Sequence, residues 1–411
     1  MRKTKSQKGI TLIALIITII VLLILAVVAI GAVQNDGVIN HAKNARDEYE
    51  KAGANENTTL EGYLDKIEDN LPVTMEDAMK PKMLTKKANS DVIDKYGNKI
   101  TVPAGFKIIV DKTTGYTEET IDATKGIVIE DAQGNQFVWI PVGNVYYSET
   151  EYKTITLGRY VNFTANSKGE YIPSQTATDY ATATLIGEYY TEHTKSNHDK
   201  EVYKNAIAED IGAFVTSAIK KGGYYLARYE AGVINYDSSK SATNSGEEIN
   251  WTGYVAEEGK ELQLVSKENV QPWNNVTQSK ASELSKNMYT SNNFKSDLIN
   301  SYAWDTAIVF IQTFSTESDA SKYADLNKSK TFANTGINTD KYCNIYDMSG
   351  NTIEWSTETY RDASNFCVRR GGWYSNYTGF PSSAGTGYRD GVIETISHST
   401  ISFRPLLYVA L

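Results

Sequence analysis

The stretch Tyr346–Ser375, YDMSGNTIEWSTETYRDASNFCVRRGGWYS, concentrates residues of special structural value. Its three glycines allow backbone conformations that other residues rarely adopt. Trp355 and Trp373 bring large apolar areas, and their indole N–H groups need buried partners. The two adjacent arginines can each satisfy several carbonyl groups or a carboxylate at once. This mixture favours a buried framework for an irregular fold, in which side chains bond backbone groups that regular ladders leave unpaired.

The composition of the whole chain bounds its function. The 411 residues are 41% apolar and 22% charged, which is ordinary for a globular protein. The net charge of −9 argues against nucleic acid or another polyanion as a partner, because phosphate binding needs a positive surface. The 28 tyrosines suit an exposed binding surface, and they equally suit a plain β-rich protein. Two cysteines are too few for a disulfide framework or a four-ligand zinc site.

The N-terminal residues predict a membrane anchor. Residues 10–33 form a run of 24 residues without a charge, and a helix of that length crosses a hydrocarbon layer about 30 Å thick. The basic residues of 1–9 precede this run, so we expect a cytoplasmic leader, one spanning helix and an extracellular C-terminal domain at the cell membrane. A cleaved signal peptide is the alternative, although its apolar region is shorter, about 7–15 residues.

The residues QKGITLIALIITII also resemble the leader of type IV prepilins and pseudopilins. In those families a peptidase cuts after a glycine that follows basic residues, and Gly9 holds that position here. Ala14 stands where the families usually carry a glutamate, which is thought to pair with a neighbouring subunit. The resemblance implies processing at Gly9 and pilus-type self-association, so a minor pilus subunit is one alternative function.

The rest of the chain divides into segments with different residue patterns. Residues 34–70 show apolar residues near helical spacing and predict a helical stalk; a solvated helix without a partner is the alternative. Residues 71–119 predict a linker and β-hairpin region that includes VIDKYGNKITVP, and GIVIEDAQGNQFVWIPVG predicts a second hairpin around a Gly-Asn turn. Residues 120–411 then form the main domain.

Three helices are expected within the main domain. The first covers 207–219 and ends at Gly222-Gly223. The second is TQSKASELSKNMY, and the third is SDLINSYAWDTAIVFIQ, which we expect to be capped by Ser296 or Asp297. The segment YYLARYEAGV predicts a strand.

Four motifs in order, LINSYAW, YDMSGNTIEW, RRGGW and SFRP, resemble the formylglycine-generating-enzyme-like family, also called the sulfatase-modifying factor family. That family is a variant of the C-type lectin fold, and the resemblance spans about 120–411. It implies an α+β domain with irregular β-structure and a few helices. With the anchor and stalk, the expected architecture is a C-type-lectin-like domain on an N-terminal transmembrane helix.

The resemblance also implies where catalysis would occur. Formylglycine-generating members use two cysteines just after the arginine-glycine-glycine turn to handle copper and oxygen, and residues 374–404 contain no cysteine. Cys343 and Cys367 precede the matching positions, so we expect no enzyme activity, with a divergent oxidoreductase as the alternative. The two cysteines form either a disulfide or two buried thiols.

A calcium site is a further implication of the resemblance, because family members can bind calcium near the matching asparagine and glutamate. These are Asn351 and Glu354, with backbone carbonyls between them, and hard oxygen ligands suit calcium. The alternative is a structural role in which Glu354 caps or pairs with Arg369 or Arg370. We favour the structural role, and thus no cofactor, because only two side-chain ligands are offered.

Residues 373–402 are the expected ligand-binding segment. Tyr, Ser, Asn, Gly or Thr occupy 18 of these 30 positions, the composition that antibody-type surfaces use. In C-type-lectin-like binders this region forms the exposed ligand face, and one subgroup is diversified by retroelements; a plain polar loop is the alternative. We predict an extracellular protein or glycan as the partner. The expected contact residues are Trp373, Tyr374, Asn376, Tyr377, Phe380, Tyr388, Arg389 and Asp390.

Overall fold

A computed structural model of the chain describes residues 19–25, 88–160, 163–173, 211–240, 253–328, 331–338, 340–359, 367–374, 385–392 and 396–411. The chain divides into two compact units, Met1–Thr74 and Met75–Leu411. In the first unit, residues 19–25 are helical. Within the described parts of the chain, no helix combines the length and apolar content needed to cross a bilayer. Gly9, the stalk and most of the expected spanning helix lie outside the described residues.

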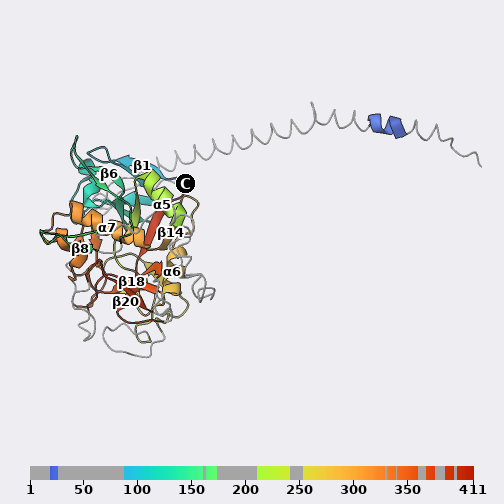
Figure 1. Cartoon of the computed structure of the whole chain (residues 1–411). Helices are drawn as coiled ribbons and strands as arrows, with labels where there is room; N and C mark the ends of the chain where they lie inside the picture. Colours follow the sequence, from blue (N-terminus) through green and yellow to red (C-terminus); the bar gives the residue numbers. More distant parts are fainter. Residues whose placement is uncertain are drawn as a thin grey trace, which may run out of the picture. The chain divides into compact units, whose positions relative to one another are not determined.

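The second unit is a mixed α+β structure in which strands predominate over a few helices (Figure 1). A six-stranded antiparallel sheet is its largest element. The last strand of the sequence lies inside this sheet, between the edge strand and a third strand, and its residues are buried in the core. In spatial order the strands are β14 (Phe294–Leu298), β21 (Pro405–Val409), β10 (Gly223–Ala227), β5 (Gln136–Pro141), β4 (Val128–Asp131) and β3 (Phe106–Ile108).

Both predicted Gly-Asn hairpins are confirmed. The first joins β1 (Ser90–Ile93) to β2 (Lys99–Val102), and the second joins β4 to β5. An aspartate organises each turn: Asp94 Oδ1 accepts the N–H of Asn98 at 2.8 Å, and Asp131 Oδ1 accepts the N–H of Asn135 at 2.8 Å. Such side-chain bonds stabilise the turn locally, which explains why these hairpins are readable from sequence. Two further hairpins join β6 (Gly143–Tyr146) to β7 (Tyr152–Ile155) and β8 (Phe163–Ala165) to β9 (Tyr171–Pro173).

The expected helices form, with one correction. Helix α5 (Ile211–Lys221) is followed by Gly222 in the left-handed region, and α6 (Gln278–Lys286) is capped by Thr277. The expected cap of the third helix at Ser296 or Asp297 is wrong, because these residues belong to β14 and pair with β21. Helix α7 (Ser301–Phe314) begins later, and the Asn300 side chain accepts the N–H of Ala303 at 2.9 Å. Tertiary strand pairing overrides the local helical pattern here.

A second sheet carries the motifs of the C-terminal region at the opposite end of the unit from β1 and β6 (Figure 1). Its strand β17 pairs in parallel with β20 and antiparallel with β18, and β18 pairs antiparallel with β19. In spatial order the strands are β19 (Arg389–Val392), β18 (Cys367–Arg370), β17 (Ile353–Thr359) and β20 (Ile401–Phe403).

Smaller elements complete the unit. They are a three-stranded sheet of β12 (Gln263–Val265), β11 (Gly232–Ile234) and β13 (Gln271–Pro272), the hairpin of β15 (Lys341–Tyr342) and β16 (Ile345–Tyr346), and the 3₁₀ turns η2 (Glu118–Thr120), η3 (Ala123–Lys125) and η4 (Ala320–Asp325).

Tryptophans lie at the centre of the buried clusters. Trp304 is fully buried on α7, and its indole N–H donates to the carbonyl of Thr386 at 2.9 Å. Trp355 is fully buried on β17, and its indole N–H donates to the carbonyl of Val276 at 2.7 Å. Each ring therefore buries a large apolar area without leaving its polar atom unsatisfied. The framework role predicted for Trp355 is confirmed.

Candidate functional site at the C-terminal segment

Two described stretches, 367–374 and 385–392, border residues 375–384 in sequence. Their strands β18 and β19 pair with each other, with Arg370 opposite Arg389 and Cys367 opposite Val392. The N–H of Gly371 extends this ladder to the carbonyl of Tyr388 at 3.3 Å. The two ends of the intervening segment are therefore held side by side by backbone hydrogen bonds.

The N-terminal border is fixed by the glycine pair of the RRGGW motif. Gly371 has a φ of +90°, which side-chain-bearing residues rarely adopt. A Cβ atom on Gly372 would lie 2.8 Å from the carbonyl oxygen of Ser349, closer than real Cβ contacts allow. Both glycines are needed because the turn packs directly against the Met348–Ser349 backbone.

The C-terminal border is held by η4. The N–H of Thr386 donates to the carbonyl of Leu326 at 3.0 Å, and the N–H of Gly387 donates to the carbonyl of Ala324 at 2.7 Å. A Cβ atom on Gly385 would approach the carbonyl carbon of Asp325 to 2.3 Å. This border is thus anchored independently of the β18–β19 pairing.

A buried charge network lies beneath the borders. Asp305 of α7 contacts Arg370 at 2.5 Å and Arg389 at 3.2 Å. Glu358 of β17 contacts Arg389 at 2.6 Å, Arg159 at 2.8 Å and Arg370 at 3.1 Å. Burial would raise the pKa of Glu358, but the charges of Arg389, Arg159 and Arg370 outweigh burial and hold that pKa far below its ordinary value. This network joins α7 and β17 to both borders, through Arg370 of β18 and Arg389 of β19.

Two further arginines of the motifs have carboxylate partners. Arg369 donates to Asp390 through Nε and Nη2 at 2.8 and 2.6 Å. Arg404 of the SFRP motif donates to Glu354 through Nε and Nη2 at 3.0 and 2.6 Å. The expected pairing of Glu354 with Arg369 or Arg370 is wrong, because Glu354 pairs with Arg404. The parallel pairing of β17 with β20 places the end of the YDMSGNTIEW motif beside the SFRP motif.

The residues expected to hold calcium are already engaged. Both carboxylate oxygens of Glu354 accept from Arg404. The Asn351 side-chain oxygen accepts the N–H of Ala333 at 2.9 Å, and its amide donates to Glu230 and to the carbonyl of Ala333. In the described part of the chain, no group of three or more His, Cys, Asp or Glu residues could hold a metal ion. The guanidinium of Arg404 occupies both oxygens of Glu354 and repels a cation, so Asn351 and Glu354 do not fit calcium.

Several buried acids surround Arg404. Burial, together with the charges of Asp347 and Glu354, raises the pKa of Glu230 well above its ordinary value. Burial also raises the pKa of Asp347 to about 8 and that of Asp340 to about 6. One guanidinium cannot neutralise this many carboxylates, so some of them are protonated at neutral pH.

The structure does not join the two cysteines in a disulfide. Cys343 packs at the edge of the core cluster around α7, whereas Cys367 lies in the cluster around Trp355. Burial raises the pKa of the Cys343 thiol to about 12. The structure thus corresponds to the alternative of two separate thiols.

The predicted contact residues fall into two groups. Asn376, Tyr377 and Phe380 lie outside the described residues. Trp373 and Tyr374 are buried, with exposed fractions of 7% and 9%. Trp373 packs against Tyr388 with ring centroids 6.0 Å apart.

The remaining two predicted contact residues, Arg389 and Asp390, hold the ion pairs described above. The structure therefore brings five of the predicted residues together at the borders of segment 375–384.

Sequence reasoning missed Asp305, Glu358 and Arg159, which form the network beneath the site. Asp305 carried a usable signal, because it is the single charge within the apolar helical stretch SYAWDTAIVFIQ. A carboxylate at a buried helical position requires a cationic partner. Arg159 carried no such signal, because its contact with Glu358 spans 199 residues.

Comparison with known proteins gives no family assignment. No family model and no curated protein matches the chain. Some solved structures have low similarity to this chain. CarF is 14% identical with a TM-score of 0.28, and the match covers 46% of this chain and 87% of CarF. PvdO from Pseudomonas aeruginosa has 12% identity and a TM-score of 0.34, covering 70% and 98%. Treponema denticola variable protein 1 has 12% identity and a TM-score of 0.26, covering 73% and 98%. These scores are too low to support an argument about fold or function.

Proposed function

We propose that the chain is a single-pass surface protein of the cell membrane whose extracellular domain binds a protein or glycan through residues 373–402. The domain would be a formylglycine-generating-enzyme-like variant of the C-type lectin fold, as the four sequence motifs suggest. One observation carries the proposal: both borders of segment 375–384 are clamped by separate buried contacts, through Gly371–Gly372 and through Gly385–Gly387. A framework of this kind allows the segment between its borders to change without loss of the fold.

In this proposal the predicted contact residues have two different roles. Asn376, Tyr377 and Phe380 would contact the ligand directly, with the aromatic residues as anchors. Trp373, Tyr374, Tyr388, Arg389 and Asp390 would contribute from the borders, where their buried contacts hold the segment in place. A ligand that reaches this base would meet Arg389 as its polar specificity element.

Exchange of the segment tests the proposal. Residues 375–384 are replaced in the full chain by ten Ala and Ser residues, and the variant is screened on an array of glycans and extracellular proteins. The matched control replaces 241–250, another polar ten-residue segment between described elements. We expect every binding signal of the wild type to be lost in the first variant and kept in the control. Retained binding after exchange of 375–384, with an unchanged melting temperature, would refute the proposal.

Diversification by a retroelement belongs to the same proposal. Its support is the composition of 373–402, since Tyr, Asn and Ser codons are compatible with adenine-directed change. We expect alleles to differ within 373–402 and to share the clamping glycines and arginines. Sequencing the locus from several strains, together with its neighbouring DNA, checks this expectation: uniform alleles without a nearby reverse transcriptase would contradict it.

The alternatives make different predictions. A divergent oxidoreductase would need a reactive thiolate, which the raised pKa of Cys343 disfavours. Replacement of both cysteines by serine should leave ligand binding intact. A minor pilus subunit would be cleaved after Gly9 and would co-purify with filaments. Mass spectrometry of the mature N-terminus detects the cleavage.

A further inference from the structure

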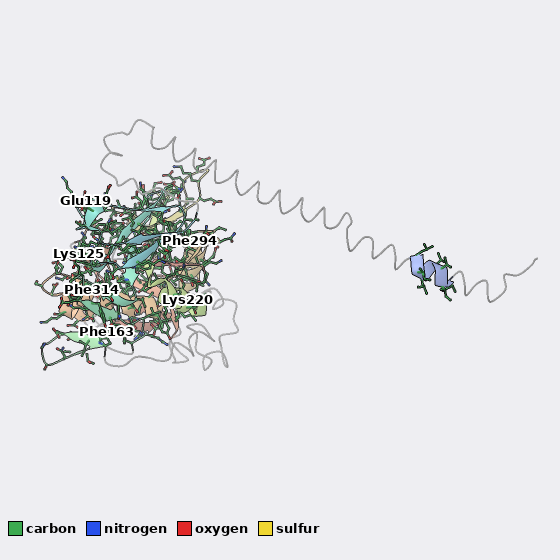
Figure 2. All side chains as sticks on the ribbon, turned by 90° about the horizontal axis from the view of Figure 1, so that it is seen from above. Glu119, Lys125, Phe163, Lys220, Phe294 and Phe314 are labelled. Atoms are coloured by element: carbon green, nitrogen blue, oxygen red, sulfur yellow. The ribbon has the colours of Figure 1, made fainter. Side chains whose placement is uncertain are left out.

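A polar pocket of ≈190 Å³ lies between residues 113–115, the C-terminal end of α7 and the β15–β16 turn. Eight of its eleven lining residues are polar, and Phe314 supplies an aromatic wall. None of these residues belongs to 373–402. One buried water needs about 10–15 Å³ of such volume, so the pocket has room for a small organic ligand. Figure 2 shows Lys125 and Phe314 on the same flank of the unit.

Cationic groups gather at this pocket. Within the described residues, the half-buried ammonium of Lys125 has no hydrogen-bond or ion-pair partner. Lys341 Nζ donates to the carbonyl of Thr113. Behind Thr113, the buried guanidinium of Arg228 donates from Nη2 to Thr113 Oγ1 at 2.8 Å, while its Nε has no acceptor in the described structure. Burial and then the charge of Arg228 lower the pKa of Lys341, while Asp111, Glu317 and Glu268 act in the opposite direction.

Carboxylates also lie at this pocket. Glu317 lines the pocket, and Asp111 lies beside it with Oδ1 accepting from the N–H and hydroxyl of Thr113 at 2.6 Å each. Glu268 also acts on Lys341, so three carboxylates stand against the three cations, but none of them forms an ion pair with Lys125 within the described residues. The Lys125 ammonium is therefore the group that matches a ligand with one negative charge.

The walls of the pocket are fixed before any ligand binds. Asn344 Nδ2 donates to the carbonyls of Thr114, Lys125 and Gly126 at 2.9, 3.0 and 2.9 Å. A Cβ on Gly126 would lie only 2.0 Å from the carbonyl oxygen of Cys343, so the two backbones are in direct contact. These bonds tie the Lys125 wall to the β15–β16 turn, and a preformed site loses less conformational entropy on binding.

We propose that this pocket binds a small hydroxylated monocarboxylate, which is the chemistry of a sugar acid. The carboxylate contacts Lys125 and Lys341, and it gives the Lys125 ammonium an anionic partner. The hydroxyl groups of the ligand face the polar side chains of Thr113, Ser315 and Thr316. This site goes beyond the proposed ligand-binding segment and does not depend on it.

Calorimetric titration of the full chain with D-glucuronate at low ionic strength tests the proposal. Parallel titrations use glucose, which lacks the carboxylate, and inorganic phosphate, which carries more charge. The variants are Lys125→Gln and Lys341→Gln, and the matched control is Lys220→Gln, which removes the same charge from the other side of the unit (Figure 2). Thermal melts confirm that each variant is folded. Lys125→Gln decides the result if Lys341→Gln does not fold, because the Lys125 ammonium bonds to no described residue.

We expect wild type and Lys220→Gln to bind glucuronate within twofold of each other, and Lys125→Gln to bind it at least tenfold more weakly. Glucose should bind at least tenfold more weakly than glucuronate. Absence of glucuronate binding to the wild type, or equal binding by Lys125→Gln and Lys220→Gln, would overturn the site. Tighter binding of phosphate than of glucuronate would overturn the assignment to a carboxylate.

Discussion

At the scale of single residues, buried charge distinguishes this domain. Arg404 and Glu354 form a two-point pair in which both side chains are fully buried. Arg404 also donates to the carbonyls of Ala227 and Tyr346, at 2.9 and 2.8 Å. One arginine thus connects the six-stranded sheet, the β15–β16 hairpin and the second sheet.

Replacing Glu354 by Gln should destabilise the domain strongly. The change removes the carboxylate that bonds the buried guanidinium of Arg404 at two points, and broken buried pairs cost about 3–5 kcal/mol. Chemical denaturation at pH 7 measures the loss. The exposed Glu258→Gln serves as the control and should change stability by less than about 0.5 kcal/mol. A similar small effect for both variants would show that Arg404 finds another partner.

Replacing Asp347 by Asn should change the pH dependence of stability. The folded-state pKa of Asp347, about 8, lies above its ordinary value of 3.8, so the folded state binds this proton more tightly than the unfolded state. The contribution is complete below about pH 3.8 and is lost as the pH rises toward 8. The N–H of Gly336, which donates to Asp347 at 2.6 Å, can still donate to the amide oxygen of Asn.

The free energy of unfolding of the variant, relative to that of the wild type, should therefore increase by about 4 kcal/mol between pH 5 and pH 8, at about 1.4 kcal/mol per pH unit. Denaturation curves at the two pH values give this difference. Parallel pH profiles for variant and wild type would contradict the raised pKa of Asp347.

At the scale of elements, local signals and tertiary pairing compete. The turns of the two Gly-Asn hairpins and the end of α5 at Gly222 depend on residues close in sequence, and they form where the sequence predicts them. Residues 296–298 are predicted as the start of a helix, yet they belong to strand β14 because β21 offers them backbone partners. Asn300 then caps α7 from a buried position.

Replacing Asn300 by Ala should destabilise the domain by about 1–2 kcal/mol, because the buried N–H of Ala303 loses its acceptor. Lys295→Ala, on the exposed face of β14, is the control and should have little effect. Urea denaturation compares the two. An Asn300 variant as stable as the control would mean that another group caps α7.

At the scale of the whole molecule, the last strand of the sequence is an internal part of the main unit. The C-terminal strand β21 lies between β14 and β10 in the largest sheet, and Met75–Leu411 forms its own compact unit. Elements from 90–108 join this unit, since β3 pairs with β4. The expected linker and hairpin region thus contributes strands to the main domain.

A fragment of residues 75–411 should fold cooperatively, whereas a fragment of residues 75–404 should not. The shorter fragment lacks β21, which leaves the facing edges of β14 and β10 without partners and opens the apolar core. Circular dichroism melts distinguish the outcomes. A cooperative transition for the shorter fragment would contradict the central role of β21.

The sequence by itself determined both Gly-Asn hairpins and the end of the helix at Gly222-Gly223, because each depends on neighbours within a few residues. It also indicated the α+β class, through the resemblance of four motifs to a known family, and the framework role of Trp355, through the size and chemistry of that side chain. It also located the C-terminal segment, through glycines and arginines whose chemistry is recognisable in isolation. Only the tertiary structure decided which arginine pairs with which carboxylate, that Asp305 and Glu358 hold the arginines at the borders of the segment, and that Lys125 and Lys341 line one pocket. Those contacts join residues far apart in the chain, and electrostatic pairing depends on distance in space, which sequence separation does not encode.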